Sequence, residues 1–309
     1  MAEAKRTVLI TGCSDGGLGA ALAHVFHEQG LRVFASARDT AKMSKQKEAG
    51  IECLELDVLS DDSIKAAVKH IASSADGKLD ILINNAGGGH YMPFLHLDLQ
   101  KARELFEINV WSYLAVTQAF LPMLMANASA TPGDKKSLLI NNTSISSVLR
   151  TPYHSAYNAS KAAIAAFNDN QRIELAPFGI KVVDLKTGST ESNFSQNKTN
   201  PFELPPGSPY EPIKEEVLNV ITGNATEAYA ESQEDWASNV VKDLLKDPDN
   251  PPAQVWRGGR AGTIQLTSKT DGVIPNGLGD KAFQQLGGLD KLEKVQAKMA
   301  DGDALNPWM

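Results

Sequence analysis

The alternation of short apolar runs with helix-like segments is the feature that most constrains the fold of this chain. Six runs of mainly aliphatic residues are clear, and a seventh is weaker: 7–11, 31–36, 51–56, 79–84, 137–141, 180–185 and 253–256. Strands this apolar are buried on both faces, so helices must cover both sides of their sheet. Right-handed crossovers then make neighbouring strands parallel. The sequence therefore predicts an α/β protein with a doubly wound, parallel seven-stranded sheet.

Helical periodicity fills most of the intervals between these runs. We predict helices at 18–29, 61–73, 97–125, 155–175 and 233–245, and shorter ones near 213–221 and 289–298. Residues 127–136 are polar and rich in turn formers, which predicts a surface loop. The pattern weakens over 188–230, a stretch too long for an ordinary connection and typical of a mobile lid over a substrate. We expect a single domain over 1–309, with 258–309 as a C-terminal extension.

Composition excludes several classes of function. The 309 residues carry a formal net charge of −7, whereas nucleic-acid-binding proteins usually show a basic stripe. The two cysteines, Cys13 and Cys53, form neither a CxxC pair nor a metal-ligand spacing, so we predict no metal and a reducing, cytoplasmic location. Cys13 is best interpreted as a small apolar filler. The first residues lead directly into an apolar run, and no continuous apolar span reaches roughly 18 residues, so we expect neither a signal peptide nor membrane attachment.

A glycine-rich loop follows the first predicted strand and opens the first helix. Its sequence, Thr11-Gly-Cys-Ser-Asp-Gly-Gly-Leu-Gly19, lets the backbone approach a pyrophosphate at a helix N-terminus. The alternative is a turn that only reverses the chain, but its place in a β-α-β unit favours a dinucleotide site. The candidate cofactor contacts in this loop are Gly12, Ser14, Gly17, Leu18 and Gly19.

The end of the second strand predicts which dinucleotide binds. Enzymes that use NAD usually carry an acid there for the ribose hydroxyls, but this chain has Ala35-Ser-Ala-Arg38. Arg38 can pair with a 2′-phosphate, and such a charge-assisted contact is worth roughly 1.5–3 kcal/mol. Ser36 can add a hydroxyl donor. We therefore predict NADP(H) as cofactor. Arg38 as a solvated surface charge is the alternative, and Asp39 beside it works against the preference.

Four residues have the chemistry needed for carbonyl reduction. Tyr157 and Lys161 are four residues apart, which places them on one face of a helix. A nearby ammonium favours phenolate, so we expect Lys161 to lower the pKa of Tyr157, which then exchanges a proton with the substrate oxygen. Ser144 follows the fifth strand and is expected to bond that oxygen, and Asn109 to order a water beside Lys161. A Tyr-x-x-x-Lys pair alone is a weak signal, but together with Ser144 and the glycine loop it is strong.

These landmarks together resemble the short-chain dehydrogenase/reductase superfamily, which has a Rossmann fold, over about Thr7 to Leu185. The resemblance implies that Asp57 and Val58 meet the adenine. It implies also that Asn85, Ala86 and Gly87, within Asn84-Asn-Ala-Gly87, line the cofactor cleft. The stretch Lys186-Thr-Gly-Ser-Thr190 would meet the nicotinamide amide through Gly188 and Thr190, and Lys161 would grip the nicotinamide ribose.

The chain departs from the superfamily pattern at two places. The glycine loop is one residue longer than the common spacing, which leaves open whether Gly16 or Gly17 meets the pyrophosphate, and Thr187 replaces a usual proline. The loop, the Phe34 to Arg38 stretch and the tail segments Val255 to Gly259 and Gly288 to Leu292 look like a fungal group of NADPH-dependent acyl-dihydroxyacetone-phosphate reductases. That group also includes enzymes of specialised metabolism.

The sequence thus predicts an oxidoreductase that reduces a ketone to a secondary alcohol with NADPH. The aromatic residues Phe94, Phe194, Phe202 and Tyr210 favour a medium-sized apolar substrate such as a lipid or polyketide. His90, Tyr91, Tyr153 and His154 either line its pocket or pack ordinarily. A non-redox isomerase or dehydratase and a regulator or template protein that binds NADP(H) are the alternatives. Trp111, Leu114, Ile164 and Phe167 are candidates for a homodimer or homotetramer contact, with core packing as the competing interpretation.

Overall fold

The computed structural model describes residues 5–128, 136–194, 203–224, 228–269 and 280–300. Seven strands form one parallel sheet in the order β3-β2-β1-β4-β5-β6-β7, which confirms the predicted doubly wound α/β architecture. The strands are β1 (Thr7–Thr11), β2 (Arg32–Ala37), β3 (Glu52–Glu55), β4 (Ile81–Asn84), β5 (Ser137–Asn142), β6 (Ile180–Thr187) and β7 (Gln254–Arg257). Each coincides with a predicted run, including the weak seventh.

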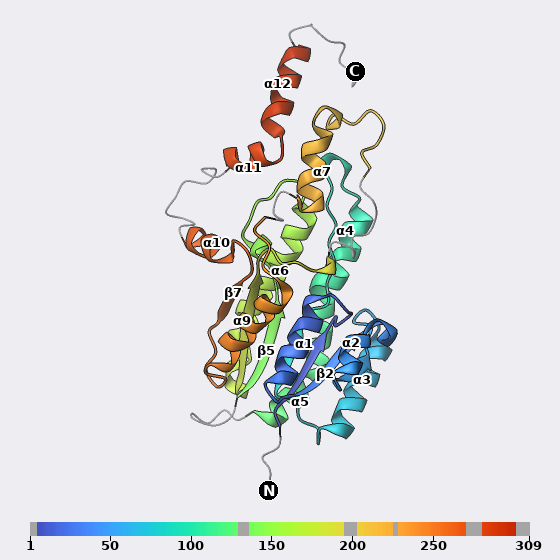
Figure 1. Cartoon of the computed structure of the whole chain (residues 1–309), viewed down its shortest axis with the longest axis vertical. Coiled ribbons are helices and arrows are strands. Elements are labelled where there is room, and N and C mark those ends of the chain that lie inside the picture. The colour runs from blue at the N-terminus through green and yellow to red at the C-terminus, as the bar shows by residue number, and fades with distance from the viewer. Residues whose placement is uncertain (1–4, 129–135, 195–202, 225–227, 270–279, 301–309) are drawn as a thin grey trace.

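The helices cover both faces of the sheet (Figure 1). They are α1 (Leu18–Glu28), α2 (Ser44–Glu48), α3 (Asp61–Ser74), α4 (Leu99–Phe106), α5 (Ser112–Asn127), α6 (Ser155–Glu174), α7 (Lys214–Thr222), α9 (Gln233–Leu245), α10 (Ala261–Ser268), α11 (Asp280–Leu286) and α12 (Leu289–Ala300). Short 3-10 turns are η1 (Thr40–Lys42), η2 (Phe94–His96), η4 (Ile145–Ser147), η5 (Ala176–Phe178) and η7 (Glu211–Ile213).

The helices differ from the expectation in four places. The long helix predicted at 97–125 is divided into α4 and α5 by the π-helical turn η3 (Glu107–Trp111). A π turn takes one more residue than an α turn and shifts the apolar positions after it by one residue, a change that is hard to recognise within one continuous helical run. The short helices α2, α10 and α11 were not predicted, and α10 has its apolar residues spread around its circumference.

Alternation along the strands divides the core into two layers. On one face Val8 and Ile10 of β1 pack with Phe26 of α1 and Trp236 of α9. On the other face Leu9 packs with side chains of α3 and α5. Cys13 is fully buried in the first layer, which matches its interpretation as a filler, and burial raises the pKa of its thiol to about 12.

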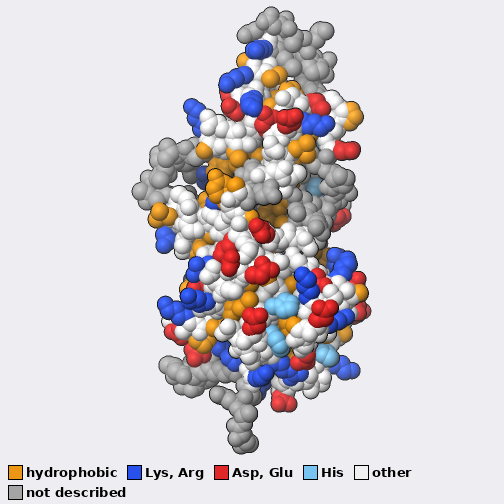
Figure 2. All heavy atoms as spheres, viewed as in Figure 1, with side chains coloured by type: hydrophobic (Ala, Val, Ile, Leu, Met, Phe, Trp, Pro, Cys, Tyr) orange, Lys and Arg blue, Asp and Glu red, His pale blue; other side chains and the backbone are white. Residues whose placement is uncertain are grey.

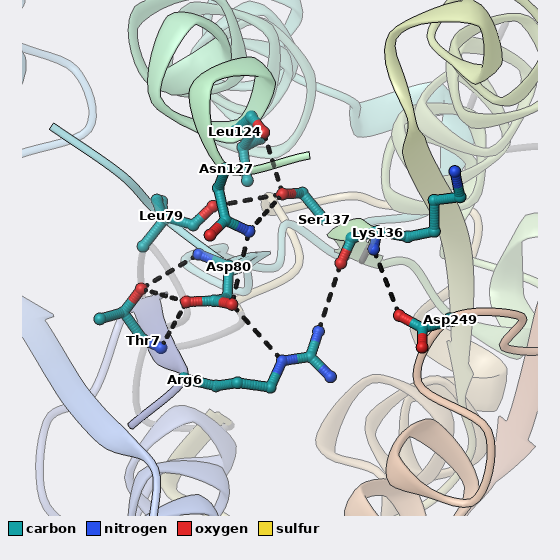
Figure 3. A network of polar contacts seen from close by, with 9 residues as sticks. All are labelled: Arg6, Thr7, Leu79, Asp80, Leu124, Asn127, Lys136, Ser137 and Asp249. Atoms are coloured by element: carbon teal, nitrogen blue, oxygen red, sulfur yellow. Dashed lines mark hydrogen bonds and ion pairs between the residues drawn. The ribbon is translucent and has the colours of Figure 1, made fainter. Parts of the chain in front are cut away.

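A polar network closes the sheet at the amino ends of its strands (Figure 3). The carboxylate of Asp80 accepts hydrogen bonds from the backbone N–H and the hydroxyl of Thr7, both at 2.8 Å. Its other oxygen lies 3.5 Å from the Arg6 guanidinium and 3.4 Å from the Asn127 amide, which also donates to Ser137. The polar groups at this edge therefore bond one another.

Helices α7, α11 and α12 lie together beyond the opposite edge and are called the cap (Figure 1). Val217 and Ile221 of α7 pack with Tyr153, Leu289 and the other apolar residues of α11 and α12. The predicted helix near 213–221 is thus an element of the cap. Residues 195–202 and 225–227 of the predicted lid lie outside the described residues, as does Phe202.

The surface carries charges of both signs, and one long helical run is apolar. In Figure 2 acidic and basic side chains are interspersed over α2 and α9 on the face that the picture shows. One helical run, Leu99–Asn127, is long and apolar enough by length and composition to cross a membrane, but half of its apolar window is buried, as in a core helix.

Candidate active site

A cleft of about 1420 Å³ opens at the carboxyl ends of β1, β4, β5 and β6, beneath the cap. Strand order reverses around β1, and such switch points are where doubly wound sheets bind ligands. Most of the residues predicted for the site line this cleft: Gly12, Ser14, Gly17, Leu18, Arg38, Val58, Asn85, Ala86, Gly87, Ser144, Tyr157, Lys161, Gly188 and Thr190.

The glycine loop is held against the end of β4. The Thr11 hydroxyl accepts hydrogen bonds from the N–H groups of Asn85 and Ala86 at 2.9 and 3.0 Å. Gly12 has φ +76°, and a Cβ there would come within 2.8 Å of the Ala86 Cα. A Cβ at Gly19 would come within 2.5 Å of the Gly12 carbonyl, and Gly19 does not line the cleft. Gly19 was predicted to contact the cofactor, but in the structure it instead permits close packing of α1.

The two adjacent glycines of the loop have different surroundings. Gly16 has φ +75° and is covered by Asn193, whose N–H donates to the Gly16 carbonyl at 2.9 Å. Gly17 precedes α1, lines the cleft, and leaves the helix N-terminus without a side-chain cap. The first N–H groups of a helix need an acceptor and favour an anion. Gly17, not Gly16, is therefore the glycine placed to meet a pyrophosphate.

Two cations stand at the end of the cleft beyond β2. Arg38 is exposed and lines the cleft, and Lys42 of η1 lines the same cleft. Lys42 was not predicted, because only the short turn of η1 carries it back toward β2. The neighbouring Asp39 also lines the cleft, but one of its carboxylate oxygens accepts the Ala41 N–H at 2.9 Å.

Two predicted cofactor contacts lie behind the cleft surface. Ser36 is fully buried, and its hydroxyl donates to the Ile10 carbonyl at 2.9 Å, so the expectation that it meets a phosphate is wrong. Asp57 does not line the cleft, because its carboxylate accepts the Leu59 N–H at 3.0 Å within the turn after β3. Val58 beside it does line the cleft.

Ser144, Tyr157 and Lys161 lie together at the centre of the cleft. Tyr157 and Lys161 are one turn apart on α6, and Ser144 directly precedes η4. Burial raises the pKa of Tyr157 to about 12, and a hydrogen bond with Ser144 offsets only part of this effect. The expectation that Lys161 lowers this pKa is wrong in the structure, because desolvation of the phenolate outweighs the other effects.

Lys161 bonds the backbone rather than the phenol. Its Nζ donates to the Asn142 carbonyl at 3.0 Å, and it lies 6.0 Å from the centre of the Tyr157 ring. Burial lowers its pKa to about 8, against the opposing charge of Asp184. The Asn142 side chain also accepts from the Thr187 hydroxyl at 2.6 Å. Thr187, found where the superfamily usually has proline, thus holds the loop after β6 by a side-chain hydrogen bond.

Asn142 was missed in the sequence, although its position at the carboxyl end of β5 is a usable signal. Its side-chain amide also donates to Asn85 at 2.8 Å, so it joins β4, β5, β6 and α6. Asn109 lies deeper, fully buried in the π turn. Its amide donates to the Gly88 carbonyl and to Ser160, and its oxygen accepts the Gly88 N–H at 2.9 Å. Asn109 therefore supports the cleft from behind.

Aromatic side chains line the cleft toward the cap. Tyr91 lies between Tyr157 and His154, with ring centres 5.4 and 4.3 Å away, and Phe194 lies 6.0 Å from Tyr157. His90 lines the cleft as well. The other residues proposed for a substrate do not: Tyr153 and Tyr210 pack within the cap region, and Phe94 is 78% exposed.

Known proteins share this arrangement of elements. The family model for short chain dehydrogenases matches residues 6–202. A short-chain dehydrogenase/reductase of Pestalotiopsis microspora is 42% identical over 95% of this chain and 98% of its own length. An NADPH-dependent 1-acyldihydroxyacetone phosphate reductase of Schizosaccharomyces pombe is 32% identical over 85% of this chain and 90% of its own.

Solved structures agree with these sequence relatives. A short-chain dehydrogenase from Streptomyces avermitilis superimposes with a TM-score of 0.71 at 26% identity, covering 96% of this chain and 98% of its own. One from Burkholderia cenocepacia, in complex with NADP, has a TM-score of 0.64 at 24% identity, covering 87% and 94%. The chain belongs to the short-chain dehydrogenase/reductase family, whose members are oxidoreductases acting on CH–OH and C=O groups.

Proposed function

We propose that this protein reduces a ketone to a secondary alcohol with NADPH. The observation that carries the proposal is the juxtaposition of Ser144, Tyr157 and Lys161 in the cleft that opens at the glycine loop. Gly12 leaves space where any larger residue would meet the Ala86 backbone, and the uncapped end of α1 faces an anion site, so these residues fit a dinucleotide.

Tyr157 is the proton donor in this proposal. Its pKa of about 12 keeps the phenol protonated at neutral pH, which suits an acid that protonates a carbonyl oxygen. The Ser144 hydroxyl, within hydrogen-bonding reach of Tyr157, orients the same oxygen. Bound NADPH supplies the hydride for the carbonyl carbon. Lys161, held by the Asn142 carbonyl, would hold the ribose hydroxyls of the cofactor and lend positive charge to the site.

Arg38 and Lys42 support NADPH over NADH. Both cations line the adenosine end of the cleft, where a 2′-phosphate would lie, and each charge-assisted contact is worth roughly 1.5–3 kcal/mol. The named NADPH dependence of the Schizosaccharomyces pombe relative and the NADP bound in the Burkholderia structure agree with this preference.

The substrate we propose is a medium-sized, mainly apolar ketone. The cleft beside Tyr157 is lined by the apolar or aromatic side chains of Tyr91, Leu105, Phe194 and Leu286. Such a surface gains free energy by covering apolar substrate area and offers few fixed polar contacts. This part of the cleft therefore selects for shape and apolarity.

We propose further that the enzyme is cytoplasmic and forms a homodimer through α4–α6. Trp111 and Phe167 contact each other, with ring centres 6.2 Å apart, and both are partly exposed. Ile164, a predicted contact of the second subunit, is fully buried within the subunit and is therefore a core residue. Light scattering of a Trp111→Glu/Phe167→Glu variant should show a monomer where the unchanged protein is a dimer.

The experiment that tests the function is turnover of NADPH with a panel of apolar ketones, with benzil as an activated probe. Consumption of NADPH should be followed at the nicotinamide absorbance, together with identification of the alcohol. Tyr157→Phe should abolish the reaction while still binding NADPH. Binding of NADPH without turnover of any ketone by the unchanged protein would contradict the proposed reduction and favour a regulator or a non-redox enzyme.

A further inference from the structure

A buried ion pair lies directly behind the residues of the proposed reaction. Asp184 and Lys186 stand two residues apart on β6 and so share one face of the strand. The Lys186 Nζ lies 2.6 Å from Asp184, with only 4% and 2% of the two side chains exposed. Burying two charges costs several kcal/mol per ion unless their bonding partners are well placed. Because of this cost, stability alone does not explain why a buried ion pair is found in this position.

The pair bonds the loop that carries Ser144. Lys186 Nζ donates to the Ser147 hydroxyl at 2.8 Å, and that hydroxyl donates to the Ser144 carbonyl at 2.7 Å. On the other side, the Thr143 hydroxyl donates to the Asp184 carboxylate. Residues on both sides of Ser144 are thus connected to one ion pair, so the pair holds the loop against β6.

The Asp184 carboxylate also acts on Lys161. It is the charged group that opposes the effect of burial and favours the ammonium form of Lys161. The rings of Tyr113 on α5 and Tyr157 on α6 face the same ammonium, at 5.5 and 6.0 Å. Burial raises the pKa of Asp184, the Lys186 ammonium and the Thr143 hydroxyl favour its carboxylate form, and the charge of Asp169 on α6 opposes that form more weakly.

We propose that Asp184 and Lys186 are a positioning pair that holds the Ser144 loop and maintains a negative charge behind Lys161. This proposal rests on the proposed function, because Ser144 and Lys161 take part in the reaction only if that function is correct. Neither member of the pair lines the cleft, so neither is a catalytic residue. Removing the pair is expected to reduce the rate at saturating ketone more than it changes KM.

Three variants separate this role from stability alone. Asp184→Asn and Lys186→Met each leave one buried charge unpaired and should lower Tm strongly. Asp184→Asn/Lys186→Met removes both charges and should recover much of the lost Tm. With NADPH and benzil, kcat of the double variant should remain about 10-fold to 100-fold low, the range expected for a displaced catalytic group. Its alkaline loss of activity should begin at a lower pH, because Lys161 loses the charge that favours its ammonium.

A matched control and a milder variant keep the test decisive. Arg257→Met/Asp243→Asn removes the neighbouring ion pair of β7 and α9, which has an N–O distance of 2.7 Å and no contact with the Ser144 loop, and should leave kcat and the pH profile unchanged. Ser147→Ala breaks the link to the loop without unpairing a buried charge and should lower kcat severalfold at nearly constant Tm. Lys186→Arg should restore kcat relative to Lys186→Met.

The result that overturns the proposal is a folded double variant with the kcat and alkaline limb of the unchanged enzyme. A second readout does not require turnover. Between about pH 8 and pH 10 the unfolded chain holds the Lys161 proton more tightly than the folded one, so this residue makes stability rise with pH. That rise should begin at a lower pH in the double variant. An unshifted rise contradicts the proposal, whereas inactivity of the unchanged protein alone contradicts only the proposed function.

Discussion

The sheet has a buried carboxylate with polar partners at the amino ends of its strands, here called the amino edge, and another at their carboxyl ends, the carboxyl edge. The polar groups at the two edges differ in whether they lie beside the cleft. At the amino edge Asp80 bonds Thr7, Arg6 and Asn127 (Figure 3), and none of these residues lines the cleft of the candidate site. At the carboxyl edge Asp184 and its partners lie behind a cleft of about 1420 Å³. There the inner polar groups bond one another while Ser144, Tyr157 and Lys161 remain accessible from the cleft.

This contrast shows how one fold separates stability from chemistry. All seven strands are parallel, so their carboxyl ends meet at one edge, where the loops that follow them can hold a ligand. The amino ends need only satisfy their own backbone and side-chain groups. Changes at the amino edge should therefore alter stability without altering turnover, and changes of the side chains that line the cleft should alter turnover with little effect on stability. The following predictions test this division.

The largest effect is expected for Tyr157→Phe. Removing the proton donor should lower kcat by about 10²-fold to 10⁴-fold, the range for a general acid, while Tm stays nearly constant because the ring remains packed. Steady-state kinetics with NADPH and benzil, together with thermal unfolding, measure both. A large loss of Tm in this variant would contradict the separation of stability from turnover between the two edges.

The next effect concerns the cofactor. Arg38→Ala/Lys42→Ala should raise the KM for NADPH by at least about 10²-fold, because two charge-assisted phosphate contacts are lost, and should leave the KM for NADH unchanged. A comparison of kcat/KM for the two cofactors measures the preference. Lys45→Ala, a substitution of a lysine outside the cleft, is the control. Equal loss with both cofactors would mean that these cations do not read the phosphate.

Asp80→Ala should have the opposite character. It leaves the buried N–H of Thr7 without its carboxylate, which costs about 2 kcal/mol, or roughly 30-fold in the unfolding equilibrium. The kcat of the folded fraction should not change. Denaturant unfolding and kinetics below the transition are the measurements. A fall in kcat at constant stability would show that the amino edge influences the site.

The smallest effect is the pH dependence of the unchanged enzyme. Lys161, with a pKa of about 8, is charged below that pH and loses its charge above it. Tyr157, with a pKa of about 12, stays protonated across the same range. Reduction should therefore fall about tenfold between pH 7 and pH 9. A constant rate over this range would indicate that the charge of Lys161 is not needed.

Much of the fold could be predicted because local sequence patterns determine it. Every strand and the helices α1, α3, α6, α7, α9 and α12 follow from apolar periodicity, which reports the faces that each element buries. The π turn that holds Asn109 could not be predicted, because it lies inside one continuous helical run. The helix α10 could not be predicted, because its apolar residues do not form a stripe on one face.

The candidate site was predicted less completely. The residues at strand ends and in the glycine loop were found because motif spacing identifies them. Ser36 was placed wrongly, because alternation along β2 turns its side chain toward Ile10 rather than the cleft. Lys42, Asn142 and the pair of Asp184 and Lys186 were missed, since their partners lie on other elements.

The amino-acid sequence by itself determined the order of strands and helices, the glycine loop and the spacing of Tyr157 and Lys161, because these depend on neighbours within a few turns of chain. Only the tertiary structure decided the ionisation of that pair. Burial raises the pKa of Tyr157 and lowers that of Lys161, and the charge that opposes the second effect comes from Asp184 on another element. Desolvation and charge proximity are properties of the packed site, so no local pattern reports them.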